Sequence, residues 1–164
     1  MDRGRELLHT GDFIGQFSDA FQGGQQTKEA QIRASELQKA HEEKRIKAEI
    51  AAAEKWIAEN VRTVVEAANV DLAQIDLQVT IETRTSGPSV RTQLTIRNTR
   101  TTDQPKHTVT FAINKDGAII LHRNVRGDRA GSNYGTIKDT DASCVKQTLL
   151  QVLGEMGSGA AAVD

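Results

Sequence analysis

The chain has 164 residues, of which 37% are hydrophobic, and it carries 21 lysine and arginine residues against 22 aspartate and glutamate residues. This length and apolar content suit one modest core with extended ends and leave little room for two full domains. The net charge of −1 excludes a global basic field that would draw the chain onto nucleic acid, so nucleic-acid binding would need a local patch.

Targeting signals and cysteine usage narrow the class of protein further. No apolar run approaches the ~20 residues of a membrane span, and the charged N-terminus lacks the hydrophobic region of a secretory signal. The single cysteine, Cys144, excludes an internal disulfide framework and a cysteine-based zinc site. We therefore expect a cytoplasmic protein that does not act on a membrane.

Residues 1–26 predict an N-terminal arm with one short amphipathic helix over residues 13–22. Asp12 is placed to cap this helix, and Gly23-Gly24 is placed to end it at a flexible joint. The apolar face either packs on the chain's own core or docks into a groove of a partner. The polar face has no lysine or arginine, which argues against a membrane surface. The predicted partner-binding residues are Phe13, Ile14, Phe17 and Phe21.

A long helix is predicted after the arm. No glycine or proline occurs between Gln25 and Ser86, and nearly every residue from Thr27 to Asn69 is a good helix former. One helix over that span would be roughly 60 Å long, about twice the diameter of a small domain. A chain of this size cannot bury such a helix, so the pattern points to assembly or recognition.

The two halves of this helix differ in chemistry. Residues 27–45 are mostly charged, with i,i+4 pairs such as Lys39 and Glu43, and form either an exposed helix or one ordered by oligomerisation or a partner. No strict heptad is present, so no long parallel coiled coil is predicted. The second half has a helical apolar stripe that predicts packing on a core: Ile46, Ile50, Ala53, Trp56, Ile57, Val61, Val64, Val65 and Ala68.

After Asp71 the apolar period changes from 3.6 to 2. The alternation predicts half-buried antiparallel strands over 77–82, 90–97 and 108–113, followed by a fourth strand over 118–124. Ser86-Gly87-Pro88 turns the first pair, and residues 114–117 make a hairpin into the fourth strand. The fourth strand alternates poorly, which indicates a central position or a bulge.

The C-terminal part predicts a loop of about 15 residues, from Val125 to Thr140, and a last helix from Asp141 to Met156, capped by Thr140 or Asp141. The fold class is therefore α+β: a long N-terminal helix packed on a four-stranded antiparallel β-meander with a C-terminal helix. One domain spans 27–156, with the charged helical half at 27–45 and the globular core at 46–156. The tail, 157–164, is expected to be disordered.

Arginine residues are the main candidates for anion or nucleic-acid binding. Several lie at outward positions of the predicted strands, but these positions hold no aromatic side chain on which a base could stack. Arginine and threonine on an outer sheet face also serve solubility and strand propensity. The glycine-rich 125–140 loop either cradles an anion at the start of the last helix or is an Ω-like surface loop. The candidate contacts are Arg84, Arg91, Arg97, Arg100, Arg126 and Arg129.

An enzyme is the remote alternative. Cys144 lies in the first turn of the last helix, where the helix N-terminus favours a thiolate, and His107 and His122 are the histidines of the strand region. A small buried cysteine explains this residue without chemistry. The four histidines are scattered over different elements, so no metal site is predicted, and no cofactor is expected.

These patterns favour a non-enzymatic protein–protein interaction or assembly protein, such as a structural component, an adaptor or an inhibitor. Its Phe-rich N-terminal helix and long helix would engage a protein partner or a sister subunit in a homo-oligomer. The alternative is a nucleic-acid-associated module that uses the arginines of the exposed sheet face. The remote alternative is a small enzyme that uses Cys144.

Overall fold

The structure, a computed structural model, describes residues 10–101, 107–125 and 128–158; for residues 10–14 and 128–130 it describes the backbone alone. The chain divides into two compact units, Met1–Lys44 (unit 1) and Arg45–Asp164 (unit 2). Each unit is described by itself. The predicted boundaries of the arm, the single domain and the tail stay a prediction.

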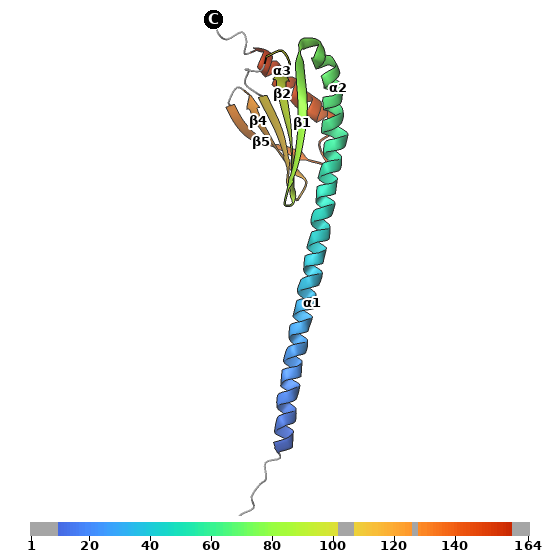
Figure 1. The fold of residues 1–164 in the computed structure, drawn as a ribbon, viewed down its shortest axis with the longest axis vertical. Helices are drawn as coiled ribbons and strands as arrows, with labels where there is room; N and C mark the ends of the chain where they lie inside the picture. Colours follow the sequence, from blue (N-terminus) through green and yellow to red (C-terminus); the bar gives the residue numbers. More distant parts are fainter. Residues whose placement is uncertain (1–9, 102–106, 126–127, 159–164) are drawn as a thin grey trace, which may run out of the picture. The chain divides into compact units, whose positions relative to one another are not determined.

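The first helix, α1, runs from Thr10 to Trp56 without interruption (Figure 1). The predicted short helix that ends at Gly23-Gly24 is therefore wrong, because both glycines lie inside α1, and so does Asp12, its predicted cap. Each glycine costs a helix only about 1 kcal/mol relative to alanine, and helix propagation is cooperative, so the good helix formers that follow outweigh the pair. The Thr27 hydroxyl adds a hydrogen bond to the Gly23 carbonyl at 2.9 Å.

In unit 1, every side chain from Gly15 to Lys44 is exposed. Charged side chains pair along the helix, as Arg33 does with Glu29 at 3.8 Å. Exposed i,i+4 pairs of this kind contribute only about 0.2–0.5 kcal/mol each. Local propensity, rather than a core, accounts for the helical conformation of this segment.

In unit 2 the helix continues through a π-helical segment, Ile57–Arg62, then α2, Thr63–Leu72, and a 3-10 turn, Ala73–Ile75. A π-helix turns less per residue than an α-helix, so Val61 comes round nearly to the side of Trp56, five residues before it. Both side chains are buried. The predicted apolar stripe is the side of this helix that packs into the core, with six buried residues: Ala53, Trp56, Ile57, Val61, Val64 and Val65.

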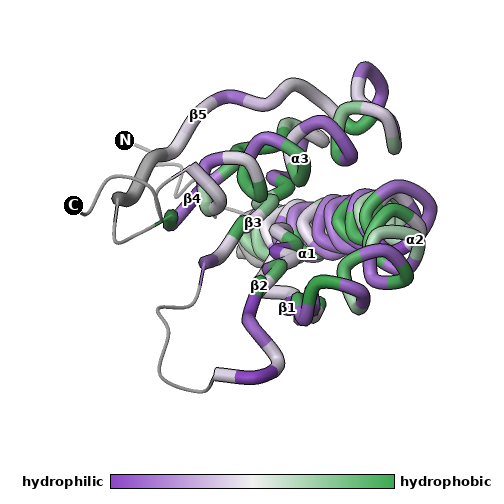
Figure 2. The backbone as a smooth tube through the Cα atoms, turned by 90° about the horizontal axis from the view of Figure 1, so that it is seen from above, coloured by the Kyte–Doolittle hydropathy of each residue, from purple (hydrophilic) through white to green (hydrophobic). Residues whose placement is uncertain are grey.

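The sheet has five antiparallel strands in chain order. They are β1 (Leu77–Ser86), β2 (Ser89–Asn98), β3 (His107–Ile113), β4 (Ala118–Val125) and β5 (Asp128–Thr136), and the last helix is α3 (Ala142–Ser158). The α+β class, the long helix, the antiparallel meander and the C-terminal helix are confirmed. Figure 2 shows that α2 and α3 lie on the same side of the sheet, and no described helix covers the opposite face, which we call the open face.

The predicted number of four strands is wrong, because β5 occupies the segment expected to be a loop. The sequence of β5 does not alternate and contains Gly131 and Gly135, so its strand conformation rests on backbone pairing with β4. The register shifts at Ile119/Ile120, where Gly135 and Asn133 pair and Tyr134 is left over. A bulge of this kind re-aims the extra side chain.

The bulged Tyr134 anchors β5 to the core. Its ring packs edge-to-face on Phe111 with centroids 5.3 Å apart, and Phe111 packs in the same way on Trp56 at 5.9 Å. The hydroxyls of Tyr134 and Thr148 are 3.0 Å apart and share a hydrogen bond. Burial raises the pKa of Tyr134. Three aromatic rings thus link the long helix, the centre of the sheet and the edge strand.

Both predicted hairpins are present. Gly87, with φ of 57°, and Pro88 form the two-residue connection between β1 and β2, as a type II′ turn requires. Between β3 and β4 the Gly117 amide donates to the Asn114 carbonyl at 2.9 Å, and Gly117 has φ of 74°. Glycine adopts these left-handed conformations at no steric cost.

The last helix begins at the predicted cap and ends slightly later than expected. The Asp141 carboxylate accepts hydrogen bonds from the backbone amides of Ser143 at 3.0 Å and Cys144 at 3.1 Å. The hydrogen bond from the Cys144 amide is the main cause that lowers the pKa of Asp141. The helix extends to Ser158, into the predicted tail, whereas residues 159–164 lie outside the described part.

Candidate functional site

The open face of the sheet presents a row of polar side chains across four strands. Register pairs Glu82 with Gln93, Gln93 with Thr110, and Thr110 with His122. Side chains of directly paired residues project from the same face of a sheet. The core-facing neighbours of this row, such as Leu94, Phe111 and Leu121, are buried on the other face.

The adjacent row holds two arginines directly opposite each other. Arg84 of β1 pairs in register with Arg91 of β2, and Arg91 pairs with Ala112 of β3. Like charges placed directly opposite on neighbouring strands are destabilising. Arg84 turns to Glu82, whose Oε1 accepts from its Nε at 2.9 Å. Arg91 makes no hydrogen bond or ion pair with the residues that the structure describes.

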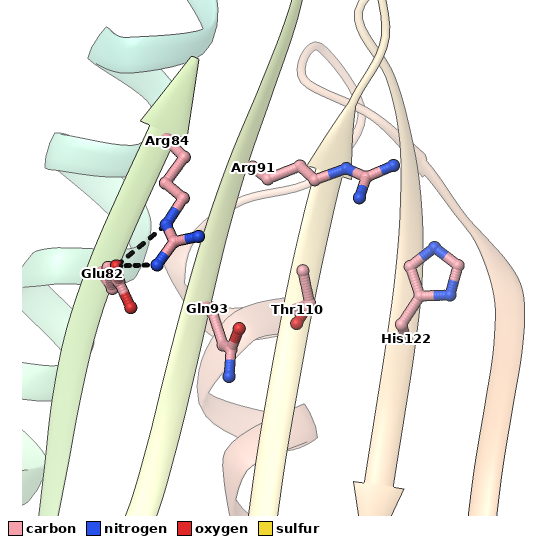
Figure 3. Close-up of a pocket in the computed structure, with 6 residues that line it drawn as sticks. All are labelled: Glu82, Arg84, Arg91, Gln93, Thr110 and His122. Atoms are coloured by element: carbon pink, nitrogen blue, oxygen red, sulfur yellow. Dashed lines mark hydrogen bonds and ion pairs between the residues drawn. The ribbon is translucent and has the colours of Figure 1, made fainter. Parts of the chain in front are cut away.

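These two rows surround a hollow of about 380 Å³, lined by Glu82, Arg84, Arg91, Gln93, Thr110 and His122. Figure 3 shows the Arg84 side chain directed to Glu82, whereas the Arg91 side chain runs across β3 toward β4 and His122. The hollow therefore has a paired Glu82–Arg84 end and an Arg91–His122 end. Its side chains offer mainly hydrogen-bond donors.

The position of His122 depends on a glycine in the neighbouring strand. His122 pairs in register with Gly131 of β5. A Cβ atom at position 131 would lie 3.0 Å from Nδ1 and 3.3 Å from Cε1 of the His122 ring. A side chain at position 131 would therefore crowd the imidazole, which would have to shift by a few tenths of an ångström.

The other predicted arginines do not join this hollow. Arg97 lies near the C-terminal end of β2, where its Nη2 donates to the Gln78 side chain at 2.9 Å. Arg100 pairs with Asp76 at 2.8 Å. Arg126 lies outside the described residues, and Arg129 is described by its backbone alone, in β5. The predicted loop, whether an anion cradle or an Ω-like loop, is wrong over Asp128–Thr136, because this segment forms the edge strand β5. Anion binding by Arg126 and Arg129 stays a prediction.

Sequence reasoning found part of this site. The period of two placed Arg84, Arg91, Gln93 and Thr110 outward, but it left His122 among scattered histidines. Because Ile119, Ile120 and Leu121 are all apolar, the sequence of β4 does not indicate which of its side chains face the core. In the structure, Ile119 and Leu121 are buried. Only the register with β3 assigns His122 to the open face.

Unit 1 presents a separate candidate, an apolar helix face that we call the Phe face: Phe13, Ile14, Phe17 and Phe21. Phe17 and Phe21 are one helical turn apart, and 68% and 67% of their surfaces are exposed. Phe13 and Ile14 lie in the same helix, where the structure describes only the backbone. Leu37 is similarly exposed at 63% but lies about 160° away from Phe21 around the helix axis.

A second hollow, of about 300 Å³, lies between α2 and α3. Its lining is mostly apolar and includes Ala67, Leu72 and Leu153, with Asp71 and Lys146 also present. Leu150, also in the lining, is 57% exposed. This groove is an exposed apolar surface of unit 2.

Cys144 and the two histidines of the sheet lie on different elements of the described part of the chain. Cys144 is half-buried near the start of α3, and it lines neither of the two hollows described above. His107 and His122 lie on β3 and β4. Within residues 10–101, 107–125 and 128–158, no three histidine, cysteine, aspartate or glutamate side chains are grouped as a metal site requires. A cysteine-based enzyme stays a prediction.

Two further findings bear on the class of protein. No helix in the described part of the chain is both long enough and apolar enough to cross a membrane. No protein-family model matches the chain, and comparisons with curated proteins and with solved structures give no significant match. The assignment of function therefore depends on the surfaces described above.

Proposed function

We propose that this chain is a non-enzymatic interaction or assembly protein that binds a protein partner or a second copy through the Phe face of unit 1. One observation carries the proposal. Every side chain from Gly15 to Lys44 is exposed, and two aromatic side chains are exposed by about two thirds.

The energetics of an exposed helix support this proposal. Burying a phenylalanine side chain contributes about 1.5–3 kcal/mol, so a partner that covers Phe17 and Phe21 gains a large part of a specific affinity. Two aromatic anchors one turn apart are the pattern by which an amphipathic helix binds an apolar groove. The charged remainder of the unit 1 helix would then act as a spacer.

Nucleic-acid binding has less support from the open sheet face. Of the four arginines that could form a basic patch there, Arg84, Arg97 and Arg100 are each engaged by a neighbouring side chain. The outward positions of β1 to β4 hold no phenylalanine, tyrosine or tryptophan. A single unpaired arginine is a small electrostatic footprint for a polynucleotide.

Light scattering tests the proposal through the mass in solution of the intact chain and of a version that starts at Gln25. If self-assembly occurs through the Phe face, the intact chain forms a discrete oligomer and the shortened chain is a folded monomer. The oligomer should persist at high salt, because apolar contacts are not screened. An oligomer that the shortened chain also forms would place the interface elsewhere and contradict the proposal.

A further inference from the structure

The geometry points to a binding site for a small phosphorylated molecule in the hollow of the open sheet face, with the phosphate group at the Arg91–His122 end. This inference is independent of the Phe face, which lies in unit 1. It rests on the charge of the arginine pair, on the placement of His122, and on the distribution of donors and acceptors in the hollow.

Arg91 carries a positive charge that no described side chain compensates. Arg84 and Arg91 are directly opposite, and a single carboxylate, Glu82, is in contact with Arg84. Arg91 has no partner among the described residues, and its side chain runs across β3 toward β4 (Figure 3). Its register partner on β3 is the small Ala112. A bound anion beside Arg91 would offset the repulsion that this pairing creates.

On the β4 side of the hollow, a glycine lies beside the His122 ring. Gly131 is the neighbour of His122, and even a single methyl group there would lie 3.0 Å from Nδ1. The glycine thus leaves room for the imidazole beside the Arg91 end of the hollow. Thr110 of β3 pairs in register with His122 and also lines the hollow.

The arrangement of donors in the hollow favours a phosphate over a carboxylate. A guanidinium fork, an imidazole N–H and a hydroxyl approach from different strands, and a tetrahedral phosphate presents oxygens in several directions to meet them. A planar carboxylate is satisfied by the guanidinium fork alone. At the other end, Glu82 would accept a hydrogen bond from a hydroxyl of the ligand. The volume of about 380 Å³ is in the range of small-molecule sites.

Calorimetric titration of the full chain tests this site, with inorganic phosphate, glycerol phosphate and acetate as separate probes at constant ionic strength. We expect saturable binding of both phosphates, tighter for glycerol phosphate, and weaker binding of acetate. Arg91→Gln should weaken phosphate binding by about tenfold or more, because it removes a charged donor. Arg97→Gln is the matched control on the same face, and it should leave the affinity unchanged.

A second variant separates the site from general charge effects. Gly131→Ala changes no charge but crowds the His122 ring, which must shift by a few tenths of an ångström. It should therefore weaken phosphate binding by up to about fivefold, the loss expected if the hydrogen bond from His122 is broken. Circular dichroism of each variant verifies the fold. No saturable binding of either phosphate, or equal losses in Arg91→Gln and Arg97→Gln, would overturn the inference.

Discussion

The two parts of the long helical segment are both helical, but their surroundings are opposite. From Gly15 to Lys44 all side chains are exposed, whereas Ala53, Trp56 and Ile57 in unit 2 are only 3–4% exposed. Both parts are rich in good helix formers. Local propensity therefore accounts for the helix in both parts, whereas burial requires an apolar stripe and a sheet on which to pack. Unit 2 therefore contains its own source of stability, and unit 1 depends on propensity and on whatever binds it.

The sharpest test of this comparison truncates one phenylalanine in each unit. Phe111→Ala should lower the free energy of unfolding by about 3–5 kcal/mol, because Phe111 is fully buried between Trp56 and Tyr134. Phe21→Ala should change it by less than about 0.5 kcal/mol, since its side chain is exposed. Denaturant unfolding followed by fluorescence of Trp56, the single tryptophan, measures both. Similar losses for the two variants would contradict the division.

A second test raises helix propensity in unit 1 alone. Gly23→Ala with Gly24→Ala should stabilise the unit 1 helix by about 2 kcal/mol in total, because both glycines lie inside α1 and have open space at the Cβ position. Hydrogen exchange of the amides around positions 20–30 should slow, while the unfolding midpoint of unit 2 stays unchanged. If exchange did not slow, Gly23-Gly24 would be a joint, as the sequence pattern alone suggests.

A third test addresses how unit 2 protects the edge of its sheet. The Asn69 side chain pairs with the β1 edge, accepting from the Val79 amide at 2.8 Å and donating to the Val79 carbonyl at 2.9 Å. Asn69→Ala should lower the free energy of unfolding by about 1–2 kcal/mol, because two backbone groups lose their partner. Thermal unfolding measures the loss. Asn60→Ala, which removes one hydrogen bond to the Trp56 carbonyl, should cost less.

The smallest expected effect is the pH dependence of Tyr134. Burial raises the pKa of its hydroxyl in the folded state above the ordinary value of 10.0, so its contribution to stability is complete below pH 10 and is lost as the pH rises beyond that. Tyr134→Phe should remove this dependence and lower stability by about 1 kcal/mol near neutral pH, because the hydrogen bond with Thr148 is lost. Unchanged alkaline unfolding in the variant would contradict this assignment.

Much of the architecture follows from apolar periodicity. The apolar stripe of the second helical half and the apolar alternation of β1 to β3 predict which side of each element is buried. The fifth strand has no such signal, because its glycines and its bulge leave Tyr134 as its one large apolar contact with the core. Gly23-Gly24 gave the opposite error: the pair predicted the end of a helix, but cooperative helix propagation continues α1 through both glycines. Local sequence patterns do not predict the conformation of a segment when strand pairing or helix cooperativity determines it.

The candidate site on the open sheet face could also be predicted from the sequence only in part. Alternation placed Arg84 and Arg91 outward, but it could not indicate that they face each other, that Glu82 engages only one of them, or that Gly131 makes room for His122. Those relations depend on register between strands, which a single sequence does not state.

Site-specific photo-crosslinking tests directly whether the Phe face contacts a partner. A photoreactive phenylalanine analogue is placed at Phe17 of the full chain, with the same analogue at Leu37 as the matched control, since both side chains are exposed and lie on different sides of α1. We expect a defined covalent adduct from position 17, of twice the chain mass if the partner is a second copy, and none from position 37. No adduct at position 17, or equal adducts at both positions, would contradict binding through the Phe face.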